Sequence, residues 1–117
     1  DETTGEPLTA LAHRGARRVF SAQTARALRE LLASVVTEGT GHEAAPTEGT
    51  AAGKTGTAQT GQFAAGKELK NYWFAGFYPA RNPRYTIVVL QDGQTGPSRT
   101  SAAIFAQVCD ALDAAGE

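Results

Sequence analysis

Two adjoining apolar segments restrict the fold of this 117-residue chain more than any other feature of its sequence. Residues 72–78, YWFAGFY, place apolar side chains on both faces of a strand, which is typical of a strand covered on both sides. Residues 85–91, YTIVVLQ, are β-branched and apolar, and a short turn with Asn82 and Pro83 precedes them. Because the link is so short, the two segments are predicted to form an antiparallel hairpin.

A helix is predicted on each side of this hairpin. Ser21 is a suitable N-cap for the first, which should end near Gly39 and Gly41. Its apolar residues recur at helical spacing and are predicted to be core: Leu28, Leu31, Leu32, Val35 and Val36. The second helix should run from about Thr100 to Ala114. Its apolar stripe consists of Ile104, Phe105, Val108, Cys109 and Leu112. Cys109 is interpreted as a buried apolar residue and not as a nucleophile.

A third strand is predicted at residues 50–60, ahead of the hairpin. Residues 39–50, 61–69 and 92–98 have the composition of loops, and residues 1–18 look like loop with a possible short extended piece. The element order is therefore helix, three strands and helix. This order predicts an α+β fold in which an antiparallel sheet of about three strands is flanked by helices.

The stretch EGTAAGKTGTAQTG contains the predicted third strand and resembles a phosphate-binding loop. A phosphate-binding loop needs four residues between its first glycine and the Gly-Lys pair. Only three residues separate Gly49 from Gly53 and Lys54, and Glu48 occupies the required position. A nucleotide-binding function is therefore disfavoured by the spacing.

As a strand, the same stretch places the Thr55 and Thr57 hydroxyls on one face and Lys54 on the other. Two hydroxyls pointing the same way are natural donors to a carboxylate. Gly56 between them weakens a strand and often marks the close approach of a ligand or another backbone. A polar edge strand with a tolerated glycine is the plain alternative, since three residues alone do not define a motif.

Composition excludes several classes of protein. Apolar content of 41%, charged content of 20% and a net charge of −1 are ordinary for one globular domain, or a piece of one, and do not suggest a nucleic-acid partner. The arginines between residues 14 and 29 are mixed with acids, which predicts a solvated mixed face. No membrane-spanning run, signal peptide, disulfide, metal site or cofactor motif is indicated.

Four segments in a fixed order resemble the C-terminal part of the transpeptidase domain of class B penicillin-binding proteins. They are LRELLASVVTEGTG, AGKTGTAQ, YWFAGFYPARNPRYTIVVL and SAAIFAQVCDAL. The resemblance covers nearly all of the chain from about Val19 onward. It implies a partial β-lactamase/transpeptidase-like fold, with residues 1–117 forming the C-terminal segment of the domain.

The resemblance also implies a chemistry. In this family a serine attacks the carbonyl before a terminal D-alanine of a peptidoglycan stem peptide, and β-lactams mimic that D-alanyl-D-alanine end. By resemblance, Thr55, Gly56 and Thr57 would bind the substrate, and the Thr57 backbone N–H would be one oxyanion-hole donor. Lys54 would supply positive charge, reaching the site from behind the threonines. No metal or cofactor is implied.

The chain departs from the family pattern because none of its four serines begins a Ser-x-x-Lys or a Ser-x-Asn motif. This chain alone is therefore predicted to be inactive. We expect an excised segment of a membrane-anchored bacterial enzyme that works on the extracytoplasmic face of the cytoplasmic membrane. The segment would pair with the missing half-domain or form a dimer. The start at DETTGEPL favours this interpretation. A stand-alone non-catalytic module, or part of a serine β-lactamase or β-lactam sensor, is the alternative.

Overall fold

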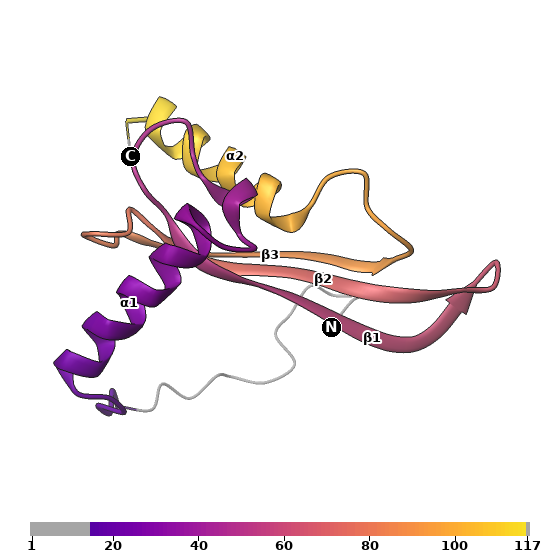
Figure 1. Cartoon of the computed structure of the whole chain (residues 1–117), viewed down its shortest axis with the longest axis horizontal. Coiled ribbons are helices and arrows are strands. Elements are labelled where there is room, and N and C mark those ends of the chain that lie inside the picture. The colour runs from indigo at the N-terminus through magenta and orange to yellow at the C-terminus, as the bar shows by residue number, and fades with distance from the viewer. Residues whose placement is uncertain (1–14, 117) are drawn as a thin grey trace, which may run out of the picture.

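The computed structural model describes residues 15–116 as one three-stranded sheet with two helices (Figure 1). The elements are α1 (Ala22–Thr37), a short 3-10 helix η1 (His42–Ala44), β1 (Ala52–Ala64), β2 (Lys67–Tyr78), β3 (Tyr85–Gln94) and α2 (Ser101–Ala114). The sheet is antiparallel, in the order β1-β2-β3. This architecture confirms the predicted α+β fold. The loop and extended piece expected within residues 1–14 lie outside the described residues.

Both helices begin at side-chain caps. The Ser21 hydroxyl accepts a hydrogen bond from the Thr24 N–H, and the Thr100 hydroxyl accepts one from the Ala103 N–H, both at 3.1 Å. Each cap satisfies an N–H group that has no partner inside the helix. The predicted N-cap at Ser21 is thus confirmed.

The predicted core stripe of α1 is wrong for Leu28 and Leu31. Leu31 is 64% exposed and Leu28 is 40% exposed, whereas Val36 is buried. Figure 1 shows why: only the C-terminal end of α1 approaches the sheet, and its first turns extend away from it. The helical spacing indicated an apolar face correctly, but no other described element covers the early part of that face.

The β1–β2 hairpin is longer than predicted. Residues 61–69, expected to be a loop, continue both strands and leave only Ala65 and Gly66 as the turn. Both turn residues have positive φ, 50° and 77°, which matches the twist of a tight two-residue hairpin. An alanine in this conformation is uncommon, so the sequence did not indicate the turn. β3 likewise continues to Gln94, beyond the predicted end.

The core lies between α2 and one face of the sheet. Phe74 of β2 and Phe105 of α2 are fully buried, with ring centroids 4.7 Å apart at a tilt of 56°. Cys109 is also fully buried, as predicted, and burial raises the pKa of its thiol to about 11. The thiol therefore stays protonated near neutral pH, which agrees with a packing role.

Most of the opposite face of the sheet is bare within residues 15–116. Trp73, Val88 and Leu90 share this face, and Val88 is 57% exposed. The prediction that residues 72–78 are covered on both sides is therefore wrong for the described part of the chain. None of the helices in this part is both long and apolar enough to cross a membrane.

Candidate active-site strand

The start of β1 is fixed to α2 by the loop that precedes it. The Thr47 N–H and hydroxyl both donate to the Asp110 carboxylate, at 2.7 and 3.0 Å. Three residues further on, the Thr50 carbonyl accepts from the Ala80 N–H at 2.8 Å. These bonds hold the loop on both sides just before the Lys-Thr-Gly residues begin.

A second anchor joins the end of β2 to the end of α2. The Tyr78 hydroxyl donates to the Asp113 carboxylate at 2.5 Å, and the Glu48 carbonyl oxygen lies 3.3 Å from the same hydroxyl. The hydrogen bond to Asp113 and the burial of Tyr78 raise the pKa of its phenol to about 12. The protonated, neutral phenol is therefore the form that donates the hydrogen bond to Asp113.

Two glycines opposite each other let β1 pack tightly against the core. Gly53 pairs with Gly76, and a Cβ on Gly53 would lie 2.6 Å from the Phe74 ring. A Cβ on Gly76 would meet the Ala52 carbonyl oxygen and the Phe105 ring. The chain directly before Lys54 is consequently held against buried aromatic side chains.

Gly56, by contrast, is not crowded by the described residues. A Cβ there would lie 3.5 Å from the Trp73 Cβ, which is ordinary van der Waals contact. The close approach that Gly56 was predicted to mark is therefore not made within residues 15–116. The space above Gly56 remains open to a ligand or to another part of a protein.

The two threonines lie on the sheet face that also carries the aromatic core. Thr55 pairs with Phe74 and Thr57 pairs with Tyr72, so the hydroxyls of both threonines point to the same side, as predicted. Thr55 is half-buried and Thr57 is exposed. Within residues 15–116 the Thr57 hydroxyl has no hydrogen-bond partner, so it is available to a ligand.

The Lys54 ammonium group contacts Thr55, although the Lys54 Cβ points to the sheet face opposite the two threonines. Its Nζ donates to the Thr55 hydroxyl at 3.1 Å and to the Thr55 carbonyl oxygen at 3.2 Å. Neighbouring residues of a strand point to opposite faces, so this side chain must pass around the outer edge of β1. The Lys54 ammonium group and the Thr55 hydroxyl therefore lie next to each other.

The outer edge of β1 has no neighbouring strand among the described elements. Since Lys54 Nζ reaches the Thr55 carbonyl from outside, that carbonyl points to this edge. In an antiparallel strand the N–H and C=O of one residue point to the same side, and residues two apart share that side. We infer that the Thr57 N–H also points to the open edge.

Three of the four serines are held by hydrogen bonds, and the fourth, Ser98, is exposed and has no hydrogen-bond partner within residues 15–116. Ser101 is buried; its hydroxyl donates to the Tyr72 carbonyl and accepts from the Gln91 amide. The hydroxyls of Ser21 and Ser34 bond within α1 or at its start. The described site can therefore offer hydrogen bonds and charge to a bound group but contains no group placed for acyl transfer.

Sequence reasoning missed the residues that position this strand. Asp110 and Asp113 lie off the apolar stripe of α2, and a carboxylate in such a place is usually a solvated surface group. Their partners, Thr47 and Tyr78, are 63 and 35 residues away in the chain. No local pattern connects positions at that separation.

Comparison with known proteins agrees with this geometry. The family described as "Penicillin binding protein transpeptidase domain" matches residues 9–110. The chain therefore belongs to the penicillin-binding protein transpeptidase domain family, which confirms the resemblance that its motifs indicated. It is 38% identical over 110 residues to penicillin-binding protein PbpB of Mycolicibacterium smegmatis, covering 81% of this chain. It is 36% identical over 95 residues to stage V sporulation protein D of Bacillus subtilis, covering 79% of this chain.

A solved structure shows the same fold. The transpeptidase domain of Burkholderia pseudomallei penicillin-binding protein 3 superimposes with a TM-score of 0.70 at 36% identity, covering 85% of this chain and 32% of that one. The sheet and helices are thus part of a β-lactamase/transpeptidase fold. The chain spans only 17% of the length of PbpB and 14% of the sporulation protein.

Proposed function

We propose that this chain supplies the carboxylate-binding and oxyanion-stabilising strand of a peptidoglycan D,D-transpeptidase. Lys54 and the Thr55 and Thr57 hydroxyls bind the terminal carboxylate of a D-alanyl-D-alanine stem peptide, or the carboxylate of a β-lactam. The Thr57 N–H is one of two donors to the oxyanion that forms when a serine attacks the adjacent carbonyl. The serine and its lysine base come from another part of the domain.

The observation that supports this proposal most strongly is the grouping of donors along one open edge. Lys54 Nζ lies 3.1 Å from the Thr55 hydroxyl, and the Thr57 hydroxyl is without a partner in residues 15–116. An extended peptide can pair with such an edge as an additional strand. The carboxylate would then meet Lys54 and the hydroxyls, and the scissile carbonyl would lie beside the Thr57 N–H.

The bare face of the sheet supports the same proposal. Trp73, Val88 and Leu90 form an apolar surface that a monomeric soluble domain would ordinarily cover. We propose that the nucleophile-bearing half of the transpeptidase domain packs on this face, in the cell envelope, on the extracytoplasmic side of the cytoplasmic membrane. Trp73 is the single tryptophan, so its fluorescence emission should shift to the blue when that half-domain binds.

A chimera tests the proposed role of β1. The aligned segment of M. smegmatis PbpB is replaced by residues 15–116 of this chain, and acylation by a fluorescent penicillin is followed on denaturing gels. We expect labelling of the chimera and none of this chain alone. Thr57→Pro, which removes the outward N–H but no ladder bond, should slow acylation by about 10²–10³-fold.

Thr57→Val is the matched control for that substitution. It removes the hydroxyl but keeps the backbone N–H, so we expect it to slow acylation by less than about tenfold, as for the loss of one ordinary hydrogen bond. Equal acylation rates for Thr57→Pro and the unaltered chimera would exclude the oxyanion role. Labelling of this chain alone would mean that it carries its own nucleophile.

A further inference from the structure

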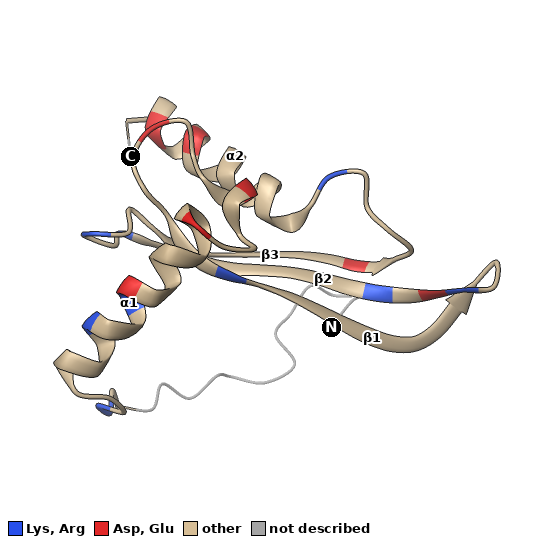
Figure 2. Ribbon diagram, in the orientation of Figure 1, with Lys and Arg blue, Asp and Glu red and all other residues tan. Residues whose placement is uncertain are grey.

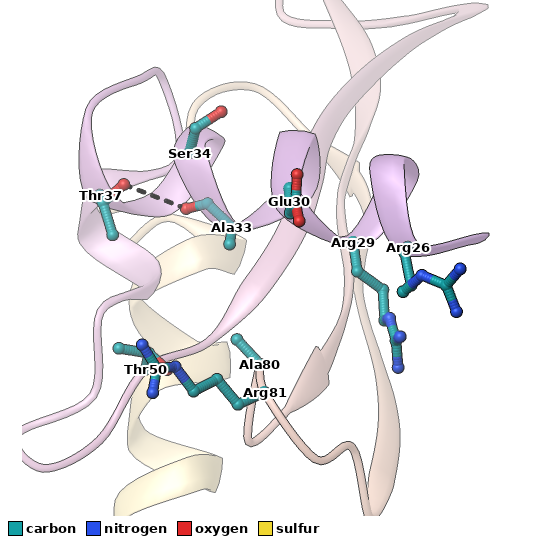
Figure 3. Close-up of a pocket in the computed structure, with 9 residues that line it drawn as sticks. All are labelled: Arg26, Arg29, Glu30, Ala33, Ser34, Thr37, Thr50, Ala80 and Arg81. Atoms are coloured by element: carbon teal, nitrogen blue, oxygen red, sulfur yellow. Dashed lines mark hydrogen bonds between the residues drawn. The ribbon is translucent and has the colours of Figure 1, made fainter. Parts of the chain in front are cut away.

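A groove lined by three arginines lies between α1 and the β2–β3 turn, apart from the Lys-Thr-Gly residues (Figure 3). Its volume is about 510 Å³. Arg26 and Arg29 come from α1, and Arg81 comes from the turn; Thr50 and Ala80 line the groove between them. Nothing in the proposed transpeptidase chemistry uses these side chains.

The charges that line the groove are not neutralised by the described residues. Within residues 15–116, Arg26, Arg29 and Arg81 have no hydrogen-bond or ion-pair partner. Glu30, the single acid among the lining residues, is also unpaired there. The lining therefore carries three positive charges and one negative charge. Figure 2 shows acids and bases mixed along α1, yet in this groove they do not neutralise one another.

The three guanidinium groups do not converge on one point. In Figure 3 the Arg81 side chain extends toward Thr50, the Arg29 side chain descends from α1, and the Arg26 side chain points away from Arg81. A single phosphate group needs donors that surround it. Donors spread along a groove instead suit several carboxylates spaced along an extended chain, because each guanidinium can bind one carboxylate through two parallel hydrogen bonds.

We propose that this groove binds an acidic polypeptide segment of a partner protein through Arg26, Arg29 and Arg81. The backbone at the groove floor is already fixed, since the Ala80 N–H donates to the Thr50 carbonyl at 2.8 Å. Arg81 therefore follows a residue that is hydrogen-bonded to the chain just before β1. Binding of the partner would take place close to the start of β1 without occupying its open edge.

The test measures binding of a fluorescent hexaglutamate peptide to the full chain by anisotropy at an ionic strength of about 0.15 M, where the Debye length is about 8 Å. Removing the three groove charges with Arg26→Gln, Arg29→Gln and Arg81→Gln should weaken binding by about tenfold or more, since three exposed ion pairs are lost together. The matched control removes three charges elsewhere, with Lys67→Gln, Lys70→Gln and Arg99→Gln. It should change affinity by less than about twofold, because distant charges are screened.

A variant that binds the peptide more tightly distinguishes an effect of the groove charges from a loss of folding. Glu30→Gln removes the repelling acid from the groove and should strengthen peptide binding by about twofold to threefold. An unfolded variant cannot give this result. Absence of peptide binding to the unaltered chain, or equal losses in the two triple variants, would overturn the proposal. So would displacement of the peptide by inorganic phosphate at an equal concentration of anionic groups, which would indicate a simple anion site.

Discussion

The two faces of the sheet are built from the same three strands and have similar apolar composition, yet only one of them is buried. Phe74 on the covered face has no exposed surface, because Phe105 and Cys109 of α2 pack against it. Trp73, its neighbour on the opposite face, is 38% exposed. Both faces of β2 are apolar, which is typical of a strand covered on both sides, whereas residues 15–116 supply the covering layer for one face only.

The largest expected effect tests whether the covered face alone stabilises the chain. Phe105→Ala removes a fully buried ring that packs on Phe74, so we expect the free energy of unfolding to fall by about 3–5 kcal/mol. Urea unfolding followed by circular dichroism measures this. Trp73→Ala on the bare face is the control, with an expected loss of about 1 kcal/mol. Equal losses would mean that the bare face is packed in solution.

Substitutions of two glycines test the same difference between the two faces of the sheet, with smaller expected losses of stability. Gly76→Ala forces a methyl group against the Ala52 carbonyl and the Phe105 ring, so we expect a loss of about 1–3 kcal/mol. Gly56→Ala meets only ordinary contact with Trp73 and should change stability by less than about 0.5 kcal/mol. Thermal unfolding of the two variants side by side measures both. A larger loss for Gly56→Ala would contradict the described packing.

A further expected effect concerns pH. The Tyr78 phenol has a pKa of about 12 in the folded chain and 10.0 when unfolded, because it donates to Asp113 and is buried. The fold favours the protonated form, so this stabilisation is complete below pH 10 and is lost as pH rises through 12. The loss should be on the order of 2 kcal/mol. Urea midpoints measured between pH 9 and 12 would show it.

Tyr78→Phe is the control for the pH dependence. Phenylalanine cannot titrate, so the difference in stability between the unaltered chain and the variant should shrink as pH rises. Cys109, whose burial raises the pKa of its thiol to about 11, is present in both proteins. A difference that stays constant across this range would show that Tyr78 does not donate to Asp113.

The sequence predicted the element order well because each element carries its own local signal. Ser21 caps α1, and runs of aromatic and β-branched residues mark β2 and β3. The errors arose where the decisive contact is not local. Leu31 has an apolar side chain but no described element to cover it, and the turn at Ala65 adopts a positive φ that alanine rarely takes. Burial and turn geometry depend on contacts with other segments, and hydrophobic periodicity carries no information about those contacts.

The geometry of the candidate site was predictable from the sequence, but the contacts that hold it in place were not. Strand parity predicted that the Thr55 and Thr57 side chains share one face, and Lys54 reaches Thr55 from the opposite face as expected. The Asp110 contact with Thr47 was not predictable, because it joins residues 63 positions apart. A carboxylate on a helix surface gives no indication of a distant loop as its partner.

The bond between Thr47 and Asp110 has a consequence for how far the C-terminal end can be shortened. Ending the chain at residue 109 would leave every residue of β1 unchanged, yet it would remove the carboxylate that restrains the preceding loop. Such a truncation would also delete Asp113, the partner of Tyr78. The last turns of α2 thus restrain the start of β1 and the end of β2 without contributing a residue to either strand.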